Sequence, residues 1–463
     1  MTFIRTCSGL ALAFLLGAAA WAADAPYEPD QGGAAVGQTL PDLLSLREQA
    51  AVRDGWLETR LDTIVPELMR EHGIDMWILV AREYLEDPVV ATMLNATSMR
   101  ARRRTILVFH DRGGEEGVER LTVSRYGLAG LFDPAWVPEE GLGQWDRLAE
   151  IVAERDPQTL ALNTSPLSAF ADGLTQSQHA GLVGALPERF GSRIVEGYPL
   201  AIGWLERRLP GELDLYRDAV RAAHAMIGEA LSSSVITPGT TTTDDVAWWF
   251  RDRMAGLDLQ PWFHPSVAVQ RSGADGFQSG DTIIQPGDLV WMDLGLSYLG
   301  LNTDTQHMAY VLRDDETDAP DGLKAGLRAA NRVQDALTGS FEAGLSGNAV
   351  LARARAAAIA RGLEPSIYTH PIGYHGHGAG PAIGFWDNQA PDPRGADRVR
   401  ADTAWAIESN ATLAVPEWND QRVVFRTEED AFFDGDTVRY LNGRQTRFHL
   451  IAPRDRASEA TTP

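Results

Sequence analysis

The chain has 463 residues, of which 44% are hydrophobic and 23% are charged, as in ordinary folded proteins. This length exceeds what one hydrophobic core usually serves, so we expect two domains of about 150 to 250 residues. The 64 acidic side chains outnumber the 41 Lys and Arg, and the net charge of −23 argues against nucleic acid or anionic lipid as a partner, because both carry phosphates.

The N-terminus has the pattern of a secretory signal peptide. One early arginine precedes an apolar stretch from about residue 10 to residue 20, and Ala20-Trp21-Ala22 is a small-x-small cleavage site. We expect residues 1–22 to be removed, which predicts a periplasmic or secreted protein. The apolar stretch is shorter than the ~20 residues of a membrane span, so we expect no membrane attachment after cleavage. The only cysteine, Cys7, lies in the removed segment, which excludes disulfides and cysteine ligands from the mature chain.

Residues 23–205 are predicted to form an α/β domain. A helix from about Asp54 carries one apolar stripe and ends at His72-Gly73. A second helical segment is expected at residues 145–155. Short apolar runs bounded by turn residues predict buried strands at residues 74–81, 105–110, 118–124 and 159–163.

Residues 206–455 change in character and are predicted to form an α+β domain. Two helices open it between residues 211 and 257, and the second is capped by a threonine run with acidic residues in its first turn. Hairpin strands, two more helices and further strand pairs follow. Helices followed by hairpins occur at 211–311 and again at 321–441, which indicates a duplicated unit. Residues 456–463 form a polar tail.

Two aspartates in the first hairpin give the clearest chemical signal. A turn at Tyr298-Leu299 would place Asp293 opposite Asp304, with Cβ atoms ~5 Å apart. Two bare carboxylates at this distance repel each other, so either one is protonated or a cation lies between them. Aspartates near a turn are more often caps. Here, however, Asp293 ends an apolar run in which an unpaired charge is costly.

Three further residues add metal-binding side chains of the same kind. His377, Glu408 and Glu428 each follow an apolar stretch, and each alone is more often a structural residue. Together with the aspartates they match two divalent cations ~3.5 to 4 Å apart, sharing carboxylates and a water activated as a nucleophile. We expect manganese first, with cobalt, zinc or iron as alternatives, because carboxylate-rich sites accept several metals. No phosphate-binding glycine motif and no G-x-S-x-G serine motif is present.

The order of these motifs resembles the pita-bread metallopeptidase family, which includes creatinase, aminopeptidase P and prolidase. The resemblance covers about residues 207 to 442 and rests on "VITPGTTTTDDVA", "GDLVWMDLGLSYLGLNTDTQHM", "GHGAGPAIGFW", "AIE" and "FRTEEDAFFDGD". Residues 23–205 are similar to the family's creatinase-type N-terminal domain. The implied fold is a pita-bread α+β catalytic domain behind an α/β domain, in a chain that is often a homodimer. The implied metal ligands are Asp293, Asp304, His377, Glu408 and Glu428.

Two of these assignments have local competitors. His375 competes with His377, and the run Gly-His-Gly-Ala-Gly favours His377. Glu429 competes with Glu428, and the family's acidic pair followed by an apolar run favours Glu428. In the family pattern Glu408 would also act as general base and later as acid.

The substrate-binding positions depart from the family pattern. His307 stands where the family has arginine, and two family histidines fall on Gly276 and Gly384. Nearby histidines are candidates to replace them, so the expected catalytic residues are Glu408, His370, His375 and His307.

Three functions follow from these observations. The first is a dinuclear Xaa-Pro aminopeptidase or dipeptidase acting on small peptides through a metal-bridging water. The second is a non-peptidase C–N hydrolase or lyase acting on a small polar molecule. The third is a metal-binding protein without catalysis.

Overall fold

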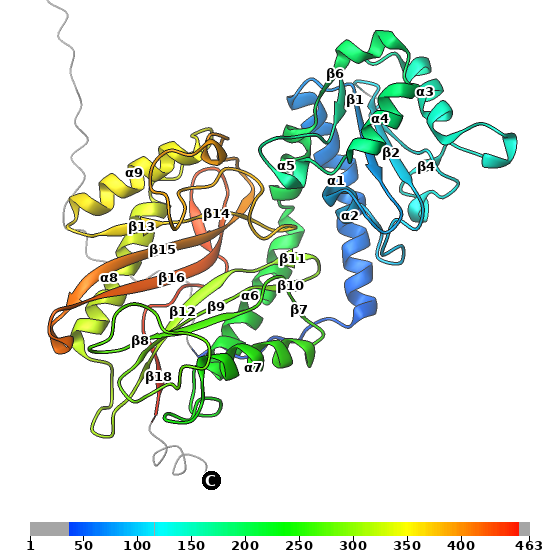
Figure 1. The fold of residues 1–463 in the computed structure, drawn as a ribbon. Coiled ribbons are helices and arrows are strands. Elements are labelled where there is room, and N and C mark those ends of the chain that lie inside the picture. The colour runs from blue at the N-terminus through cyan, green and yellow to red at the C-terminus, as the bar shows by residue number, and fades with distance from the viewer. Residues whose placement is uncertain (1–36, 115, 453–463) are drawn as a thin grey trace, which may run out of the picture. The chain divides into compact units, whose positions relative to one another are not determined.

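The computed structural model describes residues 37–114 and 116–452. The predicted signal peptide and the polar tail lie outside these residues. Within the described part, no helix combines the length and the apolar character that crossing a membrane requires. The described residues form a six-stranded sheet in the N-terminal region, and a nine-stranded and a small three-stranded sheet in the C-terminal region (Figure 1).

The N-terminal sheet has six strands in the order β4-β3-β2-β1-β5-β6. β1 pairs antiparallel with β2 and parallel with β5, as expected for an α/β domain with buried apolar strands. The four predicted strands are confirmed with small changes in their ends: β1 (Met76–Ala81), β2 (Thr105–Asp111), β3 (Val118–Thr122) and β5 (Leu160–Leu162). The two edge strands, β4 (Asp133–Pro134) and β6 (Ile194–Glu196), were not predicted.

The first long helix, α1 (Leu46–Glu71), begins eight residues before the predicted start. Ser45 caps it: the Ser45 side chain accepts from the Glu48 backbone N–H, and the Glu48 carboxylate accepts from the Ser45 N–H at 2.9 Å. The predicted apolar stripe is buried at Leu57, Leu61, Ile64, Leu68 and Met69. The other helices of this region are α2 (Pro88–Thr92), α3 (Gln144–Arg155), α4 (Gln176–Ala185) and α5 (Tyr198–Glu206).

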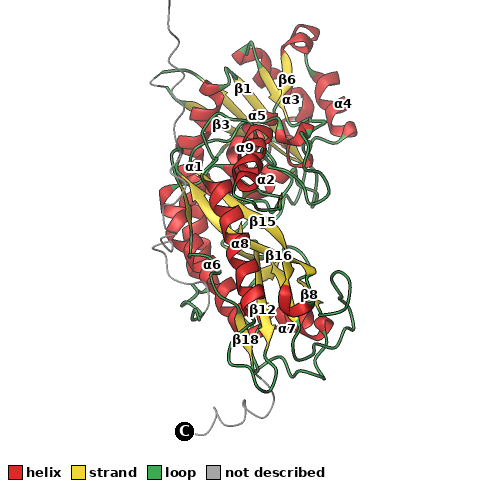
Figure 2. Cartoon of the chain, turned by 90° about the vertical axis from the view of Figure 1, so that its left-hand side faces the viewer, coloured by secondary structure: helices red, strands yellow, loops and turns green. Residues whose placement is uncertain are grey.

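Four helices belong to the C-terminal region: α6 (Pro210–Ala230), α7 (Thr243–Ala255), α8 (Asp321–Thr338) and α9 (Gly347–Ala360). The predicted threonine cap of α7 is confirmed, because Thr242 and Asp245 form a capping box. Figure 2 shows α8 passing over β15 and β16, and the apolar side chains of α8 and α9 pack with those of these strands in one buried cluster.

The C-terminal region is built on a nine-stranded sheet with the main order β13-β15-β16-β12-β9-β8. β15 and β16 have 13 residues each and pair along their whole length. The strands are β8 (Ser266–Gln270), β9 (Leu289–Leu294), β12 (Thr305–Val311), β13 (Pro365–Ile367), β14 (His370–Ile372), β15 (Thr403–Val415), β16 (Gln421–Phe433), β17 (Val438–Tyr440) and β18 (His449–Ile451).

The turn of the first hairpin corrects the sequence-based prediction. β10 (Leu296–Tyr298) pairs with β11 (Leu301–Asn302), and the short strand β7 (Gln260–Pro261) pairs with β10. The turn is therefore Leu299-Gly300, with φ values of 58° and 84°. A two-residue turn with positive φ at both positions needs a residue such as glycine, and only the Leu299-Gly300 position supplies it.

This one-residue shift of the turn moves the pairing register by two residues. Asp293 pairs with Gln306 and not with Asp304, so the predicted direct pairing of the two aspartates is wrong. A shift of two residues keeps every side chain on its face of the sheet. Asp293 and Asp304 therefore remain diagonal neighbours on the same face.

Candidate metal centre

Three of the five predicted ligands stand in one row across four neighbouring strands. Asp293 in β9 pairs with Gln306 in β12, Gln306 pairs with Glu428 in β16, and Glu428 pairs with Glu408 in β15. Directly paired residues point to the same face, and Asp304 lies two positions before Gln306 on that face. The sheet thus brings four carboxylates, far apart in sequence, to one place.

These carboxylates have few partners; Asp304 and Glu428 are buried, and Asp293 and Glu408 are half-buried. One oxygen of each of Asp293, Asp304 and Glu428 has no hydrogen-bond partner in the described chain. Gln306 is the amide in the row: its Nε2 donates to Glu428 Oε2 at 2.8 Å, and its Oε1 accepts from Trp291 Nε1 at 2.9 Å. Unpaired buried carboxylate oxygens are expensive unless a cation completes their coordination.

The pKa values of the group reflect this shortage of partners. Burial raises the pKa of Asp293 to about 7 and, with repulsion from Asp293, that of Glu408 to about 8. Burial and then repulsion from the neighbouring acids raise the pKa values of Asp304 and Glu428 well above their usual range. A divalent cation would lower these pKa values again, because its positive charge favours the ionised acids. Hard oxygen ligands such as these suit manganese or magnesium. The donor set therefore fits the metal ions that the sequence predicts.

His370 is the histidine that the structure brings to this group. Its Nε2 lies 3.7 Å from Asp304 Oδ2, and the ligand atoms of Asp304, His370 and Glu428 lie within 4.8 Å of one another. Burial lowers the pKa of His370 to about 4, so the ring is neutral. Its Nδ1 is 3.0 Å from the Pro371 carbonyl, which can only accept, so Nε2 keeps the lone pair that a metal needs.

His377 and His375 lie outside that 4.8 Å group. The His377 ring is 5.5 Å from the His370 ring and 5.3 Å from the Trp262 ring, measured between centroids. His375 is buried, with Nδ1 3.0 Å from the Gly376 carbonyl and its ring 5.6 Å from the Phe170 ring. His377 as a ligand and His375 as a catalytic residue remain predictions. From the sequence, His370 was predicted to contact the substrate. The pairing of β14 with β15, which sets His370 beside Glu408, could not be read from the sequence.

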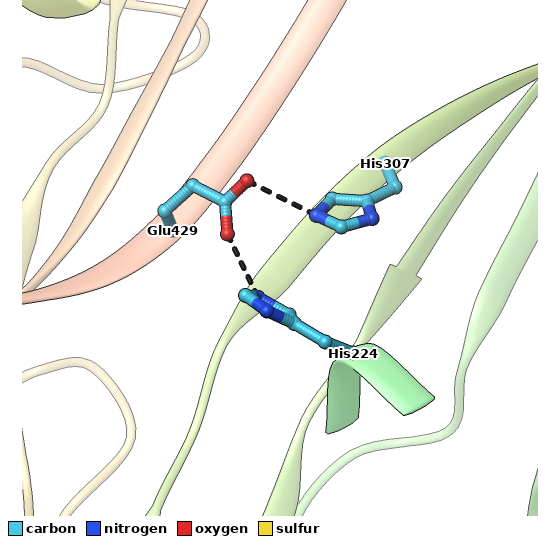
Figure 3. A group of neighbouring side chains, drawn as sticks. All are labelled: His224, His307 and Glu429. Carbon is cyan, nitrogen blue, oxygen red and sulfur yellow. Dashed lines mark hydrogen bonds and ion pairs between the residues drawn. The ribbon is translucent and has the colours of Figure 1, made fainter. Parts of the chain in front are cut away.

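His307 and Glu429 follow Gln306 and Glu428 in their strands and point to the opposite face. Figure 3 shows Glu429 between two imidazoles: Oε1 is 3.0 Å from His307 Nε2, and Oε2 is 2.9 Å from His224 Nε2. Burial opposes ionisation, but His307 and His224 lower the pKa of Glu429 to about 2. Glu428 therefore faces the acidic group and Glu429 does not. The predicted catalytic role of His307 has no support from this geometry.

A cavity of about 870 Å³ opens beside His370. Its lining includes His370, His377, Tyr368 and Arg394 from the C-terminal region, and Phe170 and Tyr198 from the N-terminal region. The aromatic rings Phe385 and Trp386 also line it. A cavity of this size and mixed lining accommodates a molecule as large as a short peptide.

Comparisons with known proteins agree with this architecture. Residues 214–434 match the model of metallopeptidase family M24. No curated protein matches the chain. The structure is similar to an X-Pro aminopeptidase from Thermotoga maritima, with 17% identity and a TM-score of 0.58, over 83% of this chain and 99% of that chain. It is also similar to an Xaa-Pro dipeptidase from Bacillus anthracis, with 18% identity and a TM-score of 0.55, over 88% of this chain and 100% of that chain.

A prolidase from Pyrococcus horikoshii gives a third such match, with 15% identity and a TM-score of 0.54, over 85% of this chain and 98% of that chain. At these identities the likeness to solved structures establishes the fold. The expected pita-bread fold with a preceding α/β part is confirmed.

Proposed function

We propose that the chain is a dinuclear aminopeptidase or dipeptidase of Xaa-Pro type. The premise is that residues 214–434 belong to metallopeptidase family M24 and that the chain is a hydrolase of metallopeptidase type. The observation that carries the proposal is the row of carboxylates Asp293, Glu428 and Glu408 on one face of the sheet, with Asp304 and His370 beside it. This row stands next to a cavity of peptide size.

The residues that would hold two divalent cations are Asp293, Asp304, Glu408, Glu428 and His370, and we propose manganese as the metal. When bound, such ions polarise an amide carbonyl and make water a nucleophile near neutral pH. The five side chains provide four acids and one neutral imidazole, which is a hard donor set with one borderline ligand.

The chain's own groups suggest how a substrate is handled. Glu408 ends the row of acids, where its carboxylate can take a proton from water and return it to the leaving amine. His377 and Tyr368 line the cavity on the side of His370, where they can donate hydrogen bonds to a peptide carbonyl. Phe385 lines the same cavity, and the Arg394 guanidinium lies 3.7 Å from the centre of its ring. The cavity therefore has an aromatic wall with one positive charge.

One observation favours the second candidate, a non-peptidase hydrolase acting on a small polar molecule. His307 points away from the acidic group, and Gly384 occupies a position where the family has a histidine. With His370 assigned to the metal ions, His377 and Tyr368 remain in the cavity to contact a substrate, so a substrate without a peptide carbonyl at that position is the alternative.

The test is the metal content of the purified mature chain together with hydrolysis of Xaa-Pro and non-proline dipeptides, with and without manganese. We expect about two metals per chain and metal-dependent release of the N-terminal residue, both lost in Asp304→Asn. The exposed strand residue Asp133 supplies the matched control Asp133→Asn, which should keep both properties. Two metals without cleavage of any peptide would move the assignment to the non-peptidase candidate, and no bound metal would refute both.

Export and assembly are also part of the proposal. The early arginine, the apolar stretch and the Ala-Trp-Ala site support cleavage after Ala22 or Ala23 and a periplasmic or secreted location. The family resemblance supports a homodimer. Mass spectrometry of the N-terminus of exported protein and light scattering of the purified chain test these two points.

A further inference from the structure

A second group of metal-binding side chains lies on the face of the sheet away from the acids. It consists of His224 from α6, His307 from β12 and Glu429 from β16, all fully buried. One ligand atom from each lies within 4.8 Å of the other two. Figure 3 shows the two rings directed at the two oxygens of the carboxylate.

Each of the three side chains has a partner behind it. Asn442 Nδ2 lies 2.9 Å from His224 Nδ1, and His449 Nε2 lies 3.1 Å from His307 Nδ1. The backbone N–H of Gln445 donates to Glu429 Oε1 at 2.6 Å. Histidines that bind metal through one ring nitrogen usually donate a hydrogen bond from the other. The contact of His307 Nδ1 with His449 fits this arrangement directly, whereas Asn442 has to turn its amide oxygen toward His224 Nδ1.

The spacing of the rings suits a tetrahedral ion. The centroids of the His224 and His307 rings are 5.1 Å apart. An ion ~2.0 to 2.1 Å from each Nε2, with a tetrahedral angle between the two bonds, places the ring centres about 5 Å apart. Each Nε2 faces one oxygen of Glu429, so the carboxylate has to turn before an ion can take the position between the two rings.

We propose that His224, His307 and Glu429 form a zinc site separate from the acidic centre, with a fourth position for water. Two imidazoles and one carboxylate are a ligand set that zinc uses, whereas carboxylate-rich sites suit manganese. The ion would tie α6 to β12 and β16, three elements that are far apart in sequence. The site is independent of the proposed peptidase activity, since none of its residues faces the cavity beside His370.

Zinc would replace hydrogen bonds that the group makes by itself. Without the ion, each Nε2–H donates to Glu429. When the ion binds, each imidazole proton moves from Nε2 to Nδ1, so neither ring changes its charge. A ring nitrogen of His449 can accept the proton of His307, and the Asn442 amide has to turn over so that its oxygen replaces Nδ2 as the partner of His224 Nδ1. His449, which contacts His307, also lines a second cavity of about 570 Å³.

The test uses the full chain with the acidic centre disabled. The double variant Asp304→Asn/Glu428→Gln is purified, treated with a chelator, titrated with zinc and analysed for bound metal. We expect one zinc per chain, with an X-ray absorption spectrum that shows two imidazole ligands. No tight zinc, or zinc surrounded by oxygen ligands only, would overturn the proposal.

Further variants locate the zinc. Adding His224→Gln to the double variant should reduce bound zinc to a small fraction, whereas His179→Gln, a histidine of α4 outside the group, should leave it unchanged. Zinc that survives His224→Gln would also refute the site. If His224→Gln does not fold, His449→Gln keeps all three ligands and decides instead: loss of its contact to His307 should weaken zinc binding ~10- to 100-fold, and unchanged affinity would contradict the proposal.

Discussion

Carboxylates on the two faces of strands β12 and β16 have opposite surroundings. On one face, one oxygen of each of Asp293, Asp304 and Glu428 has no hydrogen-bond partner in the described residues, and burial and mutual repulsion raise the pKa values of these acids. On the other face, Glu429 has N–H donors from two imidazoles and a backbone amide, and its pKa is lowered to about 2. Two glutamates adjacent in sequence thus differ in ionisation because the strand turns alternate side chains to different environments. The first face needs added positive charge, whereas the second balances its carboxylate with the chain's own donors.

The largest expected effect comes from removing a carboxylate of the acidic face. Asp304→Asn should lower activity by at least ~100-fold, since even the outer contacts of metal ligands are worth about 10- to 100-fold. It should also reduce the manganese content. Assays of kcat/KM and metal content on Asp304→Asn and the Asp133→Asn control check this. An Asp304→Asn enzyme within a few-fold of the parent would show that the acids are structural.

The next effect concerns the opposite face and is a loss of stability. Glu429→Gln leaves His224 and His307 buried with weaker partners, and an unmet buried hydrogen-bonding group costs about 1 to 3 kcal/mol. We expect a lower free energy of unfolding in urea for this variant. Glu428→Gln, its neighbour, should instead stabilise the metal-free chain, because it removes one repelling acid. Equal destabilisation by Glu429→Gln and Glu428→Gln would contradict the proposed difference between the two faces.

Stability should depend on pH in a direction set by the acidic face. The pKa values of Asp293 and Glu408, about 7 and about 8, lie above those of an unfolded chain, so the folded state favours the protonated acids. Stability of the chelator-treated chain is then full at low pH and is lost as pH rises from about 4 toward 8. Tm should fall by several degrees between pH 5 and pH 8. Manganese should restore it most at the higher pH, and a Tm without this trend would contradict the raised pKa values.

A smaller effect is expected at the amide that joins the row. Gln306→Met removes the donor to Glu428 and the acceptor for Trp291 while keeping the length of the side chain. Manganese affinity should drop ~10-fold, in the range typical of contacts behind a metal ligand. Titration with manganese measures it. Unchanged affinity would mean that Glu428 is oriented by the sheet alone.

Sequence reasoning recovered those features that depend on local pattern and motif order. The alternation of apolar residues predicted the buried strands, and the threonine run predicted the start of α7. The predicted acids Asp293, Glu408 and Glu428 do stand together in one row. The register error came from the turn, because choosing between two neighbouring two-residue turns required knowing that Gly300 takes the positive φ.

One local pattern was missed: Ser45 and Glu48 form a readable capping box at the start of α1. Other features depend on long-range contacts that no local pattern encodes. The position of His370 follows from the pairing of β14 with β15, and the group on the second face joins His224, His307 and Glu429 across more than 200 residues of chain. His307 was assigned to the catalytic face because its sequence neighbour Asp304 belongs there. Side chains alternate between the faces of a sheet, so a residue three positions further along the strand points to the opposite face.

The most direct measurement of the central claim is anomalous diffraction from crystals of the manganese-loaded chain, recorded at the manganese edge. The account predicts two peaks among Asp293, Asp304, Glu408, Glu428 and His370, on the face away from Glu429. Peaks absent from these carboxylates, or manganese bound by Glu429 in their place, would contradict it.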